Sequence, residues 1–373
     1  MRIGFNARYM HHPSRRGFNR YTYSLAKALT RQAGVEVVLI SEDPIHSSFL
    51  SDLPAEVIAV RGVRHIWWEQ AILPRLISDR RLDVFHAPGS IGLPFRKACA
   101  YVLSIHDVIG RAAARFLPKQ PWTIRAQHGI REWSSLRSAD AIITGSTHAK
   151  GDIVRWLGVS PEKVTVIPDG AEEKFRVLDS AIVASAKARF GLARPYIFYV
   201  GGFDARKNVA ALVAAYAQSG AANDADLVLA GEQTLEAQQI AHTVKALGIE
   251  SRTRFLGYVA DEDLPALYNG ATLFVFPSFY EGFGLQLVEA MACGVPVIAS
   301  NRSSVPEVLD GAGILVDPEN VGALSAAIDA VFFDRDAARR LIERGLEVAR
   351  HLSWDRAAQE TVHVYRDVIA RAS

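Results

Sequence analysis

The sequence predicts an α/β protein with two similar domains, each a parallel β-sheet with helices on both faces. Three observations support this prediction: the length of 373 residues, an ordinary globular composition, and a repeated alternation of short apolar runs with helical segments. The length exceeds what one hydrophobic core usually serves, because single domains mostly hold about 100–200 residues. Hydrophobic residues make up 49% and charged residues 22% of the chain, which excludes disorder and a long coiled coil for most of it.

The first half of the chain alternates strand-like runs with helix-like segments. In residues 18–32, apolar residues such as Tyr21, Leu25 and Leu29 recur at helical spacing between two apolar runs. Strands joined through helices in this way form parallel sheets, since each connection must cross a face of the sheet. The strands expected here are Arg2–Asn6, Val35–Ser41, Val84–Ala87, Ala100–Ser104 and Ala141–Thr144.

The second half repeats the alternation after a linker at Val166–Phe175. We expect a first domain at 1–165, a second at 166–352, and a final segment at 353–373 whose amphipathic helix packs back onto the first domain. Ligands bind beyond the carboxyl ends of parallel strands, so the two domains should face each other across a deep cleft. The strands expected in this half are Tyr196–Val200, Leu227–Ala230, Arg254–Leu256, Leu273–Pro277 and Val297–Ser300, and the helices are Asn208–Gln218, Glu262–Asn269, Leu285–Ala292 and Val321–Phe332.

Several functional classes lack the residues they need. Cys99 and Cys293 are too few for a disulfide framework or for a multi-cysteine zinc site. The apolar run after Met1 is too short for a signal peptide, and no stretch reaches the roughly 18 uninterrupted apolar residues of a transmembrane helix. There is no Gly-x-Gly-x-x-Gly after a strand, no Walker A sequence and no His-Glu-x-x-His. We therefore expect a cytoplasmic protein without a nicotinamide cofactor.

Three Asp-x-Asp triplets raise the question of a metal, since such a triplet can bind a divalent cation together with a diphosphate. Their contexts favour structural roles. The first triplet leads into a strand, the second stands at a helix start, where an aspartate acts as a cap, and the third lies in a polar helix. We therefore expect no metal site and no other cofactor. The triplets are Asp224-Ala-Asp226, Asp261-Glu-Asp263 and Asp334-Arg-Asp336.

The charge of the chain is unevenly distributed. Residues 1–165 have a formal charge of +10 and the remaining residues −8, although the whole chain is at +2. Two interpretations stay open: a drift between two solvated surfaces, or contact of the first half with an anionic membrane surface or a phosphate-bearing substrate. The same choice applies to two basic and aromatic stretches, Arg61–Arg81 and Phe116–Trp133, which supply core aromatics or contact a membrane or a lipid-linked acceptor.

The most informative stretch runs from Pro277 to Ser300 and reads PSFYEGFGLQLVEAMACGVPVIAS. A strand ends at its start, a glycine-containing loop follows, and a helix begins near Leu285. Such a helix start presents free backbone N–H groups and a positive dipole end to an anion. Glu281 and Glu289 would lie about 12 Å apart if all intervening residues were helical, which is too far for one metal or one acid–base pair. They are ordinary helix-surface glutamates, or they bind an elongated ligand with hydroxyl pairs, such as a sugar and a ribose.

This stretch resembles the E-x7-E motif of the retaining glycosyltransferases of family 4, which have the GT-B fold. The family context is S-x-x-E-G-F-G-L-x-x-x-E-A-M-A-x-G-x-P-V-I-A-S, and the chain matches it from Ser278 to Ser300. The resemblance implies two Rossmann-like domains, with the nucleotide-sugar donor on the second and the acceptor on the first. It extends over nearly the whole chain, through Gly17–Tyr21, His106-Asp107, Val166–Gly170, Tyr199–Asn208 and Asn301–Pro318.

The resemblance implies roles for five residues with polar side chains. Arg206 and Lys207 match the basic pair that clamps the donor diphosphate, where preorganised cations replace a metal. Glu289 matches the glutamate that binds the ribose hydroxyls, and Glu281 matches the one that binds hydroxyls of the transferred sugar. His106 matches a histidine beside that sugar. The expected catalytic residues are thus His106, Glu281, Arg206 and Lys207.

Further donor-binding positions follow from the same resemblance. Gly17 matches a flexible loop after the first strand that approaches the diphosphate, and Tyr258 and Val259 resemble the region that flanks the base. Many relatives have Gly-Arg where this chain has Gly202-Phe203, so one cation on the phosphate side would be missing. The loop before the helix supplies positions whose backbone amides face the sugar and the phosphate, at Gly282, Phe283, Gly284 and Leu285.

The resemblance implies a retaining hexosyltransferase, and the expected clamp cations imply one that needs no metal. A hexose would pass from a nucleotide diphosphate sugar to a saccharide or polyprenyl-diphosphate-linked acceptor. The resemblance also implies a route in which the leaving phosphate oxygen takes the acceptor's proton. Segments such as Ser104–Asp107 and Ser300–Glu307 look like bacterial mannosyltransferases of polysaccharide assembly, which favours GDP-mannose over UDP-glucose or another UDP-hexose. Peripheral contact with the anionic inner face of the cytoplasmic membrane is a further expectation, and nucleic acid is not an expected partner.

Two alternatives stay open: a sugar-phosphate synthase or phosphorylase of the same fold, and a non-catalytic subunit that binds a nucleotide sugar. A phosphorylase would need a cofactor lysine site that the sequence does not show. The intact Glu281, Glu289, Arg206 and Lys207 argue against a non-catalytic subunit. For the clamp itself, the sequence predicts that Lys207→Ala weakens donor use and barely changes the melting temperature.

Overall fold

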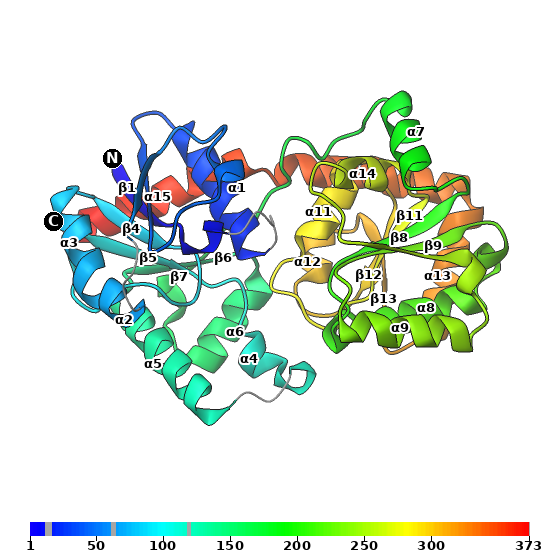
Figure 1. The fold of residues 1–373 in the computed structure, drawn as a ribbon, viewed down its shortest axis with the longest axis horizontal. Helices are drawn as coiled ribbons and strands as arrows, with labels where there is room; N and C mark the ends of the chain where they lie inside the picture. The colour runs from blue at the N-terminus through cyan, green and yellow to red at the C-terminus, as the bar shows by residue number, and fades with distance from the viewer. Residues whose placement is uncertain (12–16, 61–64, 118–120, 373) are drawn as a thin grey trace. The chain divides into compact units, whose positions relative to one another are not determined.

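The chain folds as two compact units, each built around its own parallel sheet (Figure 1). The computed structural model describes residues 1–11, 17–60, 65–117 and 121–372. The prediction of an α/β protein with two parallel sheets is confirmed. Unit 1 comprises Met1–Ala112, Leu117–Asp169 and Trp354–Ser373, and unit 2 comprises Ala113–Phe116 and Gly170–Ser353.

Unit 1 contains a seven-stranded sheet whose neighbouring strands are all parallel. Its strands are β1 (Arg2–Asn6), β2 (Glu36–Ser41), β3 (Glu56–Ala59), β4 (Val84–Ala87), β5 (Ala100–Ser104), β6 (Ala141–Thr144) and β7 (Val164–Val166). They lie in the order β3-β2-β1-β4-β5-β6-β7. In the register, Ile3 of β1 lies between Val37 of β2 and Val84 of β4, so the first strand is inside the sheet.

The apolar pattern of the sequence predicts the inner strands of this sheet but not the two edge strands, β3 and β7. The five expected strands agree with the structure to within one residue at each end. Side chains of β3 alternate between half-buried and exposed, and β7 has only three residues. An edge strand has one neighbour instead of two, so its sequence shows a weaker apolar pattern than a central strand does.

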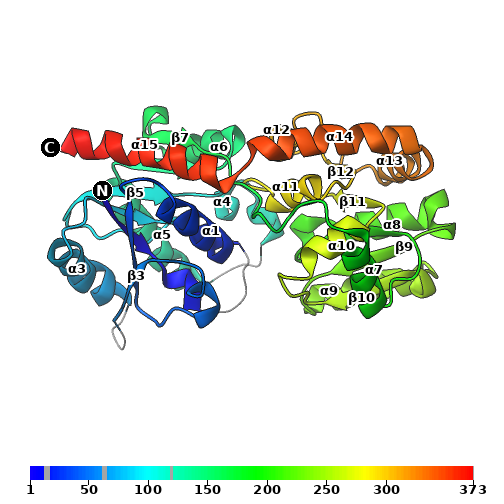
Figure 2. The same cartoon turned by 90° about the horizontal axis from the view of Figure 1, so that it is seen from above.

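Helices cover both faces of this sheet. Phe85 and Leu103 point into the core that includes Ile77 of α3 and Ile153 of α6. Their neighbours His86 and Ser104 point to the opposite face, where α15 lies beside α1 (Figure 2). The helices are α1 (Phe18–Thr30), α2 (His65–Trp67), α3 (Leu73–Asp79), α4 (Ile109–Ala112), α5 (Trp122–Ser138), α6 (Thr147–Leu157) and α15 (Trp354–Ala372), with a π-helix, η3 (Trp68–Ile72), between α2 and α3.

Unit 2 contains a six-stranded parallel sheet in the order β10-β9-β8-β11-β12-β13. The five expected strands again agree to within one residue, and the edge strand β13 was missed. The strands are β8 (Tyr196–Val200), β9 (Asp226–Ala230), β10 (Thr253–Gly257), β11 (Leu273–Phe276), β12 (Val297–Ser300) and β13 (Gly313–Val316).

The sheet of unit 2 is buried on both faces. Phe198 and Phe274 point into one apolar core, and Ile197 and Val275 point into the other. Of the helices in the described ranges, none is both long and apolar enough to cross a membrane. The helices of unit 2 are α7 (Ser180–Arg189), α8 (Val209–Gln218), α9 (Leu235–Ala246), α10 (Leu264–Gly270), α11 (Leu285–Ala292), α12 (Val305–Leu309), α13 (Val321–Phe333) and α14 (Arg335–His351).

The parallel arrangement gathers several loops of unit 2 at one edge. All six strands run in the same direction, so the loops that follow β8, β10, β11 and β12 leave from the same side of the sheet. Ligands of parallel α/β sheets bind at this carboxyl edge. The loops contain Arg206 and Lys207, Tyr258 and Val259, residues 281–284, and Ser303 and Ser304.

Candidate active site

Two loops of unit 2 contain the predicted cations and the first predicted glutamate. Arg206 and Lys207 end a 3-10 turn, η6 (Ala205–Lys207), which follows β8, and Glu281 lies in the loop after β11. The backbone N–H of Phe279 donates to the carbonyl of Arg206 over 2.8 Å, which joins the two loops. Asn208 has the left-handed conformation, with φ of 56°, and its side-chain amide donates to carbonyls just beyond β11 and β13.

Arg206, Lys207 and Glu281 form one ion-pair cluster. Lys207 Nζ lies 2.6 Å from Glu281 Oε1, and a terminal guanidinium nitrogen of Arg206 lies 3.0 Å from the same oxygen. The side chains expose only 9% (Lys207), 11% (Glu281) and 15% (Arg206) of their surface. Lys207 Nζ also lies 5.2 Å from the ring centroid of Phe276, within the range of a cation–π contact. Both predicted clamp cations therefore contact the predicted sugar-binding carboxylate.

The cluster keeps Glu281 ionised. Burial alone would raise the pKa of Glu281, but the charges of Lys207 and Arg206 outweigh it and keep that pKa below its usual value. The three residues together have one net positive charge. A phosphate group that reaches this edge meets cations that are already desolvated and oriented, so its charge is stabilised with little rearrangement of the protein.

Two serines that the sequence analysis did not assign hold the loop after β11. Ser303 Oγ accepts a hydrogen bond from the backbone N–H of Glu281 over 2.9 Å. The hydroxyl of Ser304 donates to the carbonyls of Glu281 and Phe283, at 2.9 Å and 3.0 Å. A serine directly before a helix looks like an N-cap, but Ser304 makes no capping bond to α12 and serves the loop instead.

Gly284 shapes the start of α11. Its φ of +101° lies in the region that favours glycine, and a Cβ there would be 3.1 Å from Leu287 Cδ1. The first N–H groups of a helix have no partner inside the helix. In the part of the chain that the structure describes, the backbone N–H groups of Phe283 and Gly284 make no hydrogen bond, so they can donate to a ligand oxygen. The Phe283 ring itself packs into the apolar core.

Glu289 lies in the middle of α11 and is only 2% exposed. The hydroxyl of Tyr268 in α10 donates to Glu289 Oε2 over 3.0 Å, which orients the carboxylate. Glu281 precedes α11 and is not helical, so the spacing of about 12 Å calculated for a continuous helix does not apply to this pair. Sequence reasoning missed Tyr268, because its position inside an apolar helix indicates only a core residue.

The residues after β10 divide between the surface and the core. Tyr258 exposes about half of its side chain, whereas Val259 packs into the apolar core of unit 2. The backbone N–H of Gly231, after β9, donates to the carbonyl of Gly257 over 2.9 Å and ties the two loops together. An aromatic side chain is therefore accessible at the carboxyl edge, while the valine beside it supports the loop.

In unit 1, His106 follows β5 and Gly17 directly precedes α1. His106 Nε2 lies 3.1 Å from the carbonyl oxygen of Pro88, and since a carbonyl can only accept, the proton is assigned to Nε2 and the lone pair to Nδ1. Burial lowers the pKa of His106 despite the opposing effects of the Pro88 carbonyl and Asp107, so the ring is neutral at pH 7. The ring of Phe18 lies 5.3 Å from that of His106, between centroids, which brings the start of α1 beside the histidine.

The triplet Asp261-Glu-Asp263 was expected to cap a helix, but the residue at the cap position of α10 makes no capping bond. Asp263 directly precedes α10 but makes no side-chain hydrogen bond to the first turn. Pro265 occupies the second position of α10 and has no N–H group, so one of the usual partners of a cap is missing. Asp263 forms an ion pair with Arg189 instead.

The other Asp-x-Asp triplets also have structural roles. Asp334 caps α14 by accepting from two backbone N–H groups, each at 2.9 Å. Asp226 and Asp261 each pair with a basic side chain. Among the side chains that the structure describes, no three of the types His, Cys, Asp and Glu are grouped so that they could bind a metal ion. Metal independence stays a prediction.

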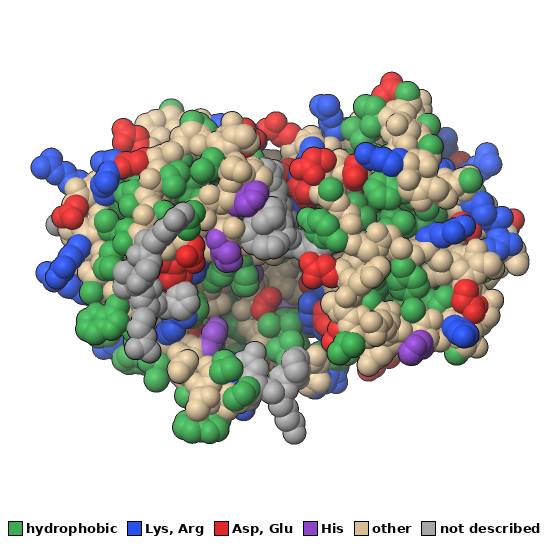
Figure 3. All heavy atoms as spheres, viewed as in Figure 1, with side chains coloured by type: hydrophobic (Ala, Val, Ile, Leu, Met, Phe, Trp, Pro, Cys, Tyr) green, Lys and Arg blue, Asp and Glu red, His purple; other side chains and the backbone are tan. Residues whose placement is uncertain are grey.

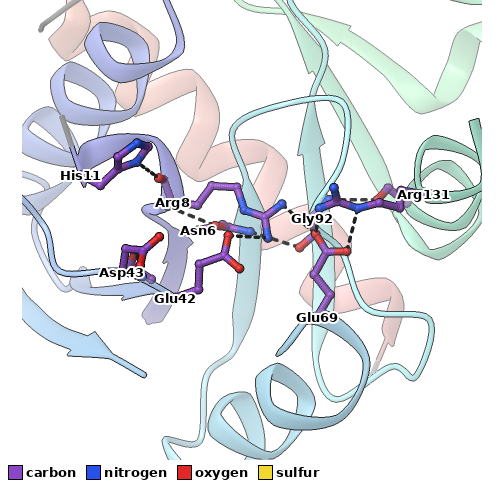
Figure 4. Close-up of polar contacts among 10 residues, drawn as sticks. Asn6, Arg8, His11, Glu42, Asp43, Glu69, Gly92 and Arg131 are labelled. Atoms are coloured by element: carbon purple, nitrogen blue, oxygen red, sulfur yellow. Dashed lines mark hydrogen bonds and ion pairs between the residues drawn. The ribbon is translucent and has the colours of Figure 1, made fainter. Parts of the chain in front are cut away.

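A second buried ion cluster lies beyond the carboxyl ends of β1 and β2 in unit 1 (Figure 4). Arg8 lies 2.7 Å from Glu69 and 3.4 Å from Glu42, measured between guanidinium nitrogens and carboxylate oxygens. Glu69 belongs to the π-helix η3 and also pairs with Arg131 of α5. In Figure 4 these side chains point toward one another. The cluster therefore attaches η3 and one side of α5 to the strand ends.

The opposite side of α5 is exposed and apolar. Trp122, Ile130 and Trp133 lie within about 80° of one another around the helix, and each exposes more than half of its side chain. Phe95 stacks on Trp133 with ring centroids 6.5 Å apart and is equally exposed. We call these four residues the α5 ridge. Figure 3 shows hydrophobic side chains gathered over α2 and α5.

The two tryptophans of the stretch Arg61–Arg81, of which residues 61–64 lie outside the described residues, differ in their surroundings. Trp68 is fully buried in the core of unit 1, whereas Trp67 exposes 63% of its surface. Among the described residues of Phe116–Trp133, which exclude 118–120, the exposed ones predominate, because α5 contacts the rest of unit 1 mainly along its inner side. The interpretation as core aromatics is therefore wrong for α5 and right for Trp68.

Comparison with known sequences identifies the family. Residues 184–348 match the family described as glycosyl transferases group 1, and residues 15–175 match glycosyltransferase family 4. The O-antigen chain mannosyltransferase B of Escherichia coli is 33% identical over 294 residues, which cover 78% of this chain and 76% of that protein. The MMP alpha-(1->4)-mannosyltransferase of Mycolicibacterium hassiacum is 31% identical over 319 residues, which cover 80% of this chain and 74% of that protein.

Comparison with solved structures agrees with the sequence matches. The sucrose-phosphate synthase of Thermosynechococcus elongatus has a TM-score of 0.77 to this chain at 25% identity, and the alignment covers 100% of both chains. The two parallel-sheet units described above are the units of the GT-B fold. The chain therefore belongs to the family 4 glycosyltransferases of the GT-B fold, and it is an enzyme that transfers a sugar.

Proposed function

We propose that this glycosyltransferase transfers mannose from GDP-mannose to a saccharide acceptor, with retention of the anomeric configuration and without a metal. The observation that supports this best is the buried cluster of Arg206, Lys207 and Glu281 at the carboxyl edge of unit 2. The cluster combines two cations for a leaving diphosphate with a carboxylate for sugar hydroxyls. The mannosyltransferases among the relatives support mannose as the transferred sugar.

The cluster and the start of α11 bind the reacting part of the donor. Arg206 and Lys207 bind the diphosphate and stabilise the negative charge that grows on it as the bond to the sugar breaks. Glu281 accepts hydrogen bonds from hydroxyls of the transferred sugar. The backbone N–H groups of Phe283 and Gly284 donate to sugar or phosphate oxygens beside it.

The nucleotide binds further along the same edge. Glu289, oriented by Tyr268, accepts hydrogen bonds from the ribose hydroxyls. Tyr258 offers an exposed aromatic surface to the base. GDP-sugars and UDP-sugars have the same ribose, so the ribose contact adds affinity for both, while the choice between guanine and uracil depends on the surroundings of the base.

The ion pairs of Glu281 support a front-face route to retention, in which the acceptor attacks from the side on which the phosphate leaves. A double displacement would need a carboxylate that attacks the anomeric carbon as a nucleophile. Two cations share one oxygen of Glu281, which lowers the nucleophilicity of the carboxylate. We therefore assign the acceptor proton to the leaving phosphate oxygen. His106 Nδ1, an acceptor in the assigned tautomer, hydrogen-bonds a hydroxyl of the transferred sugar.

Two cations in the protein perform the task that a divalent metal has in other transferases. Arg206 and Lys207 are fixed by Glu281 before the donor binds, so little reorganisation is needed as charge develops. Turnover should survive an excess of EDTA. A complete loss that Mn²⁺ or Mg²⁺ specifically restores would contradict metal independence.

We further propose that the acceptor is lipid-linked and that the α5 ridge contacts an anionic bilayer at the inner face of the cytoplasmic membrane. Exposed tryptophans such as Trp122 and Trp133 favour the membrane–water interface, where an apolar ring and a polar N–H are both satisfied. Basic side chains match anionic headgroups. Three exposed arginines near the ridge have no acidic partner among the described residues, and they are Arg96, Arg125 and Arg137.

A donor screen tests the proposed function. The purified protein is incubated separately with GDP-mannose, UDP-glucose and UDP-galactose, with and without an α-mannosyl oligosaccharide, and products are followed by mass spectrometry and NMR. We expect GDP-mannose to be consumed fastest and the new linkage to have the α configuration. Faster use of a UDP-hexose would replace the donor assignment. No consumption of any donor by the wild-type protein would favour a non-catalytic subunit.

A further inference from the structure

A buried chain of hydrogen bonds lies beneath the predicted catalytic histidine of unit 1. The hydroxyl of Tyr365 in α15 lies 2.6 Å from His86 Nδ1, and His86 Nε2 lies 2.7 Å from Ser104 Oγ. Ser104 Oγ in turn lies 2.7 Å from the hydroxyl of Tyr21 in α1. All four side chains are buried. The chain thus connects α15 with α1 through two central strands, β4 and β5.

The groups in this chain are neutral and depend on one another. Burial lowers the pKa of His86 to about 3, with a smaller contribution from His106, and burial raises the pKa values of Tyr21 and Tyr365. A neutral imidazole has one N–H, so His86 donates to one neighbour and accepts from the other. The hydroxyl groups donate in the same direction along the chain. Removing one of them therefore leaves a buried polar atom without its partner.

At its Tyr21 end, this chain of hydrogen bonds lies beside His106. The rings of Tyr21 and His106 meet edge to face, with 4.2 Å between centroids and an interplanar angle of 74°. On another side Tyr21 contacts Trp354, the first residue of α15, at 5.7 Å. The Pro88 carbonyl that accepts from His106 follows β4, the strand that contains His86. The position of His106 therefore depends on the chain both through the Tyr21 ring and through β4.

We propose that Tyr21 is a positioning residue for His106, and that Ser104, His86 and Tyr365 affect turnover through Tyr21. This inference rests on the proposed function, in which His106 contacts the transferred sugar. Apolar side chains at these four positions would also pack α15 on the sheet, and they would avoid the cost of desolvating four polar groups. Packing alone therefore does not explain why these hydrogen-bonding groups are present. What the chain adds is a fixed orientation of the Tyr21 ring. Misplacement by about 1 Å at a reacting centre can lower a rate about 100-fold, so this orientation matters for transfer.

The first test compares two tyrosines of the same helix. Tyr21→Phe and Ser104→Ala each remove one link of the chain and keep the Tyr21 ring. The matched control is Tyr23→Phe, because Tyr23 is also buried in α1 and its hydroxyl donates to Asp52 over 2.7 Å. We expect the two chain variants to lower kcat roughly 10-fold without changing KM for the donor, and the control to change neither by more than about twofold. An equal loss of kcat in the control would overturn the proposal.

The second test asks whether the effect passes through His106. The same substitutions are made in a His106→Ala background, where no imidazole remains to be positioned. A positioning role predicts that they now change kcat by less than about twofold, since residues that act as a unit are not additive. Fold losses that are equal in both backgrounds would show that the chain only stabilises the fold, and would overturn the proposal.

The third test does not depend on turnover. Imidazole NMR signals of His106 are assigned by their loss in His106→Gln, and their titration is followed in the wild type, Ser104→Ala, Tyr365→Phe and Tyr23→Phe. The titratable groups that face His106 are His86, Asp107 and Tyr21. A mobile Tyr21 admits water, so the pKa of His106 should rise toward its ordinary value in the two chain variants and stay unchanged in Tyr23→Phe. Unchanged titration in both chain variants would overturn the inference, even if transfer from every donor proves absent.

Discussion

Lys207 Nζ lies 2.6 Å from Glu281 Oε1, so the predicted diphosphate-binding cation and the predicted sugar-binding carboxylate are paired with each other. Arg206 shares the same oxygen at 3.0 Å. In the proposed function, a donor that binds here would exchange contacts: its phosphate oxygens would accept hydrogen bonds from the cations, and its sugar hydroxyls would donate to Glu281. We therefore expect the stability of unit 2 and donor binding to depend on the same buried residues.

Lys207→Ala should lower stability as well as donor use. The sequence alone predicted almost no change in melting temperature, but the structure shows that this substitution leaves buried Glu281 with Arg206 as its remaining cationic partner. Breaking a buried pair costs about 3–5 kcal/mol, and the remaining arginine should limit the loss in the free energy of unfolding to about 2 kcal/mol. Donor use should fall roughly 10- to 150-fold. Urea unfolding and steady-state kinetics measure the two effects.

Two variants serve as controls for this prediction. Lys245→Ala removes an exposed lysine of α9 and should change neither quantity. Lys207→Met combined with Glu281→Gln removes both charges of the pair, so it should be more stable than Lys207→Ala while remaining inactive. A melting temperature of Lys207→Ala equal to that of the wild type would show that the ion pair contributes nothing to the fold.

Glu289→Gln and Glu281→Gln should separate nucleotide binding from sugar transfer. Glu289 is proposed to bind the ribose, which the free nucleotide retains, so Glu289→Gln should weaken both GDP-mannose and GDP. Glu281 is proposed to bind the transferred sugar, so Glu281→Gln should leave GDP affinity nearly intact and depress kcat. Calorimetry with GDP on both variants is the measurement. Equal losses of GDP affinity would show that the role assigned to Glu281 is wrong.

Asp169 should make stability depend on pH. Burial raises its pKa from the ordinary 3.8 to about 7, so between these values the folded protein keeps a proton that the unfolded chain has lost. This contribution to stability is complete below pH 3.8 and is lost as the pH rises through 7. Asp169→Asn stays neutral, so its free energy of unfolding should rise relative to the wild type between about pH 4 and pH 8. The measurement is the free energy of unfolding in urea at several pH values across this range, with Asp79→Asn, at an exposed aspartate, as the control. If Asp169 ionises normally, the curves of free energy against pH for the wild type and for Asp169→Asn will be parallel.

The α5 ridge should determine binding to anionic membranes. The wild-type protein should cosediment with vesicles that contain phosphatidylglycerol at low salt and dissociate as the ionic strength rises. Trp122→Ser combined with Trp133→Ser should weaken this binding at least roughly 10-fold, since two exposed indole rings no longer enter the interface. Phe333→Ser, at an exposed phenylalanine of unit 2, is the matched control. If binding does not depend on the lipid charge, or if both variants lose vesicle binding equally, a soluble acceptor is the better proposal.

The sequence determined the inner strands of both sheets and the residues of the donor motif. Central strands such as β8 and β11 are buried on both faces, so they need unbroken apolar runs that can be recognised without a structure. Three of the four edge strands, β3, β7 and β13, were missed, because an edge strand has a neighbour on one side only, and β10 was the edge strand that the sequence predicted. The motif residues Glu281 and Glu289 were found through the resemblance, because their types and spacing are specific to one family.

The tertiary structure alone decided how those residues contact one another. Lys207 and Glu281 are far apart in the sequence and become neighbours only because parallel strands deliver their loops to one edge of the sheet. The hydrogen-bonded chain from Tyr365 to Tyr21 depends on the register of β4 and β5, which pairs His86 with Val102, two residues before Ser104 on the same strand. A local pattern shows the face of each element, but contacts between distant residues depend on strand order and register, and these arise when the whole sheet assembles.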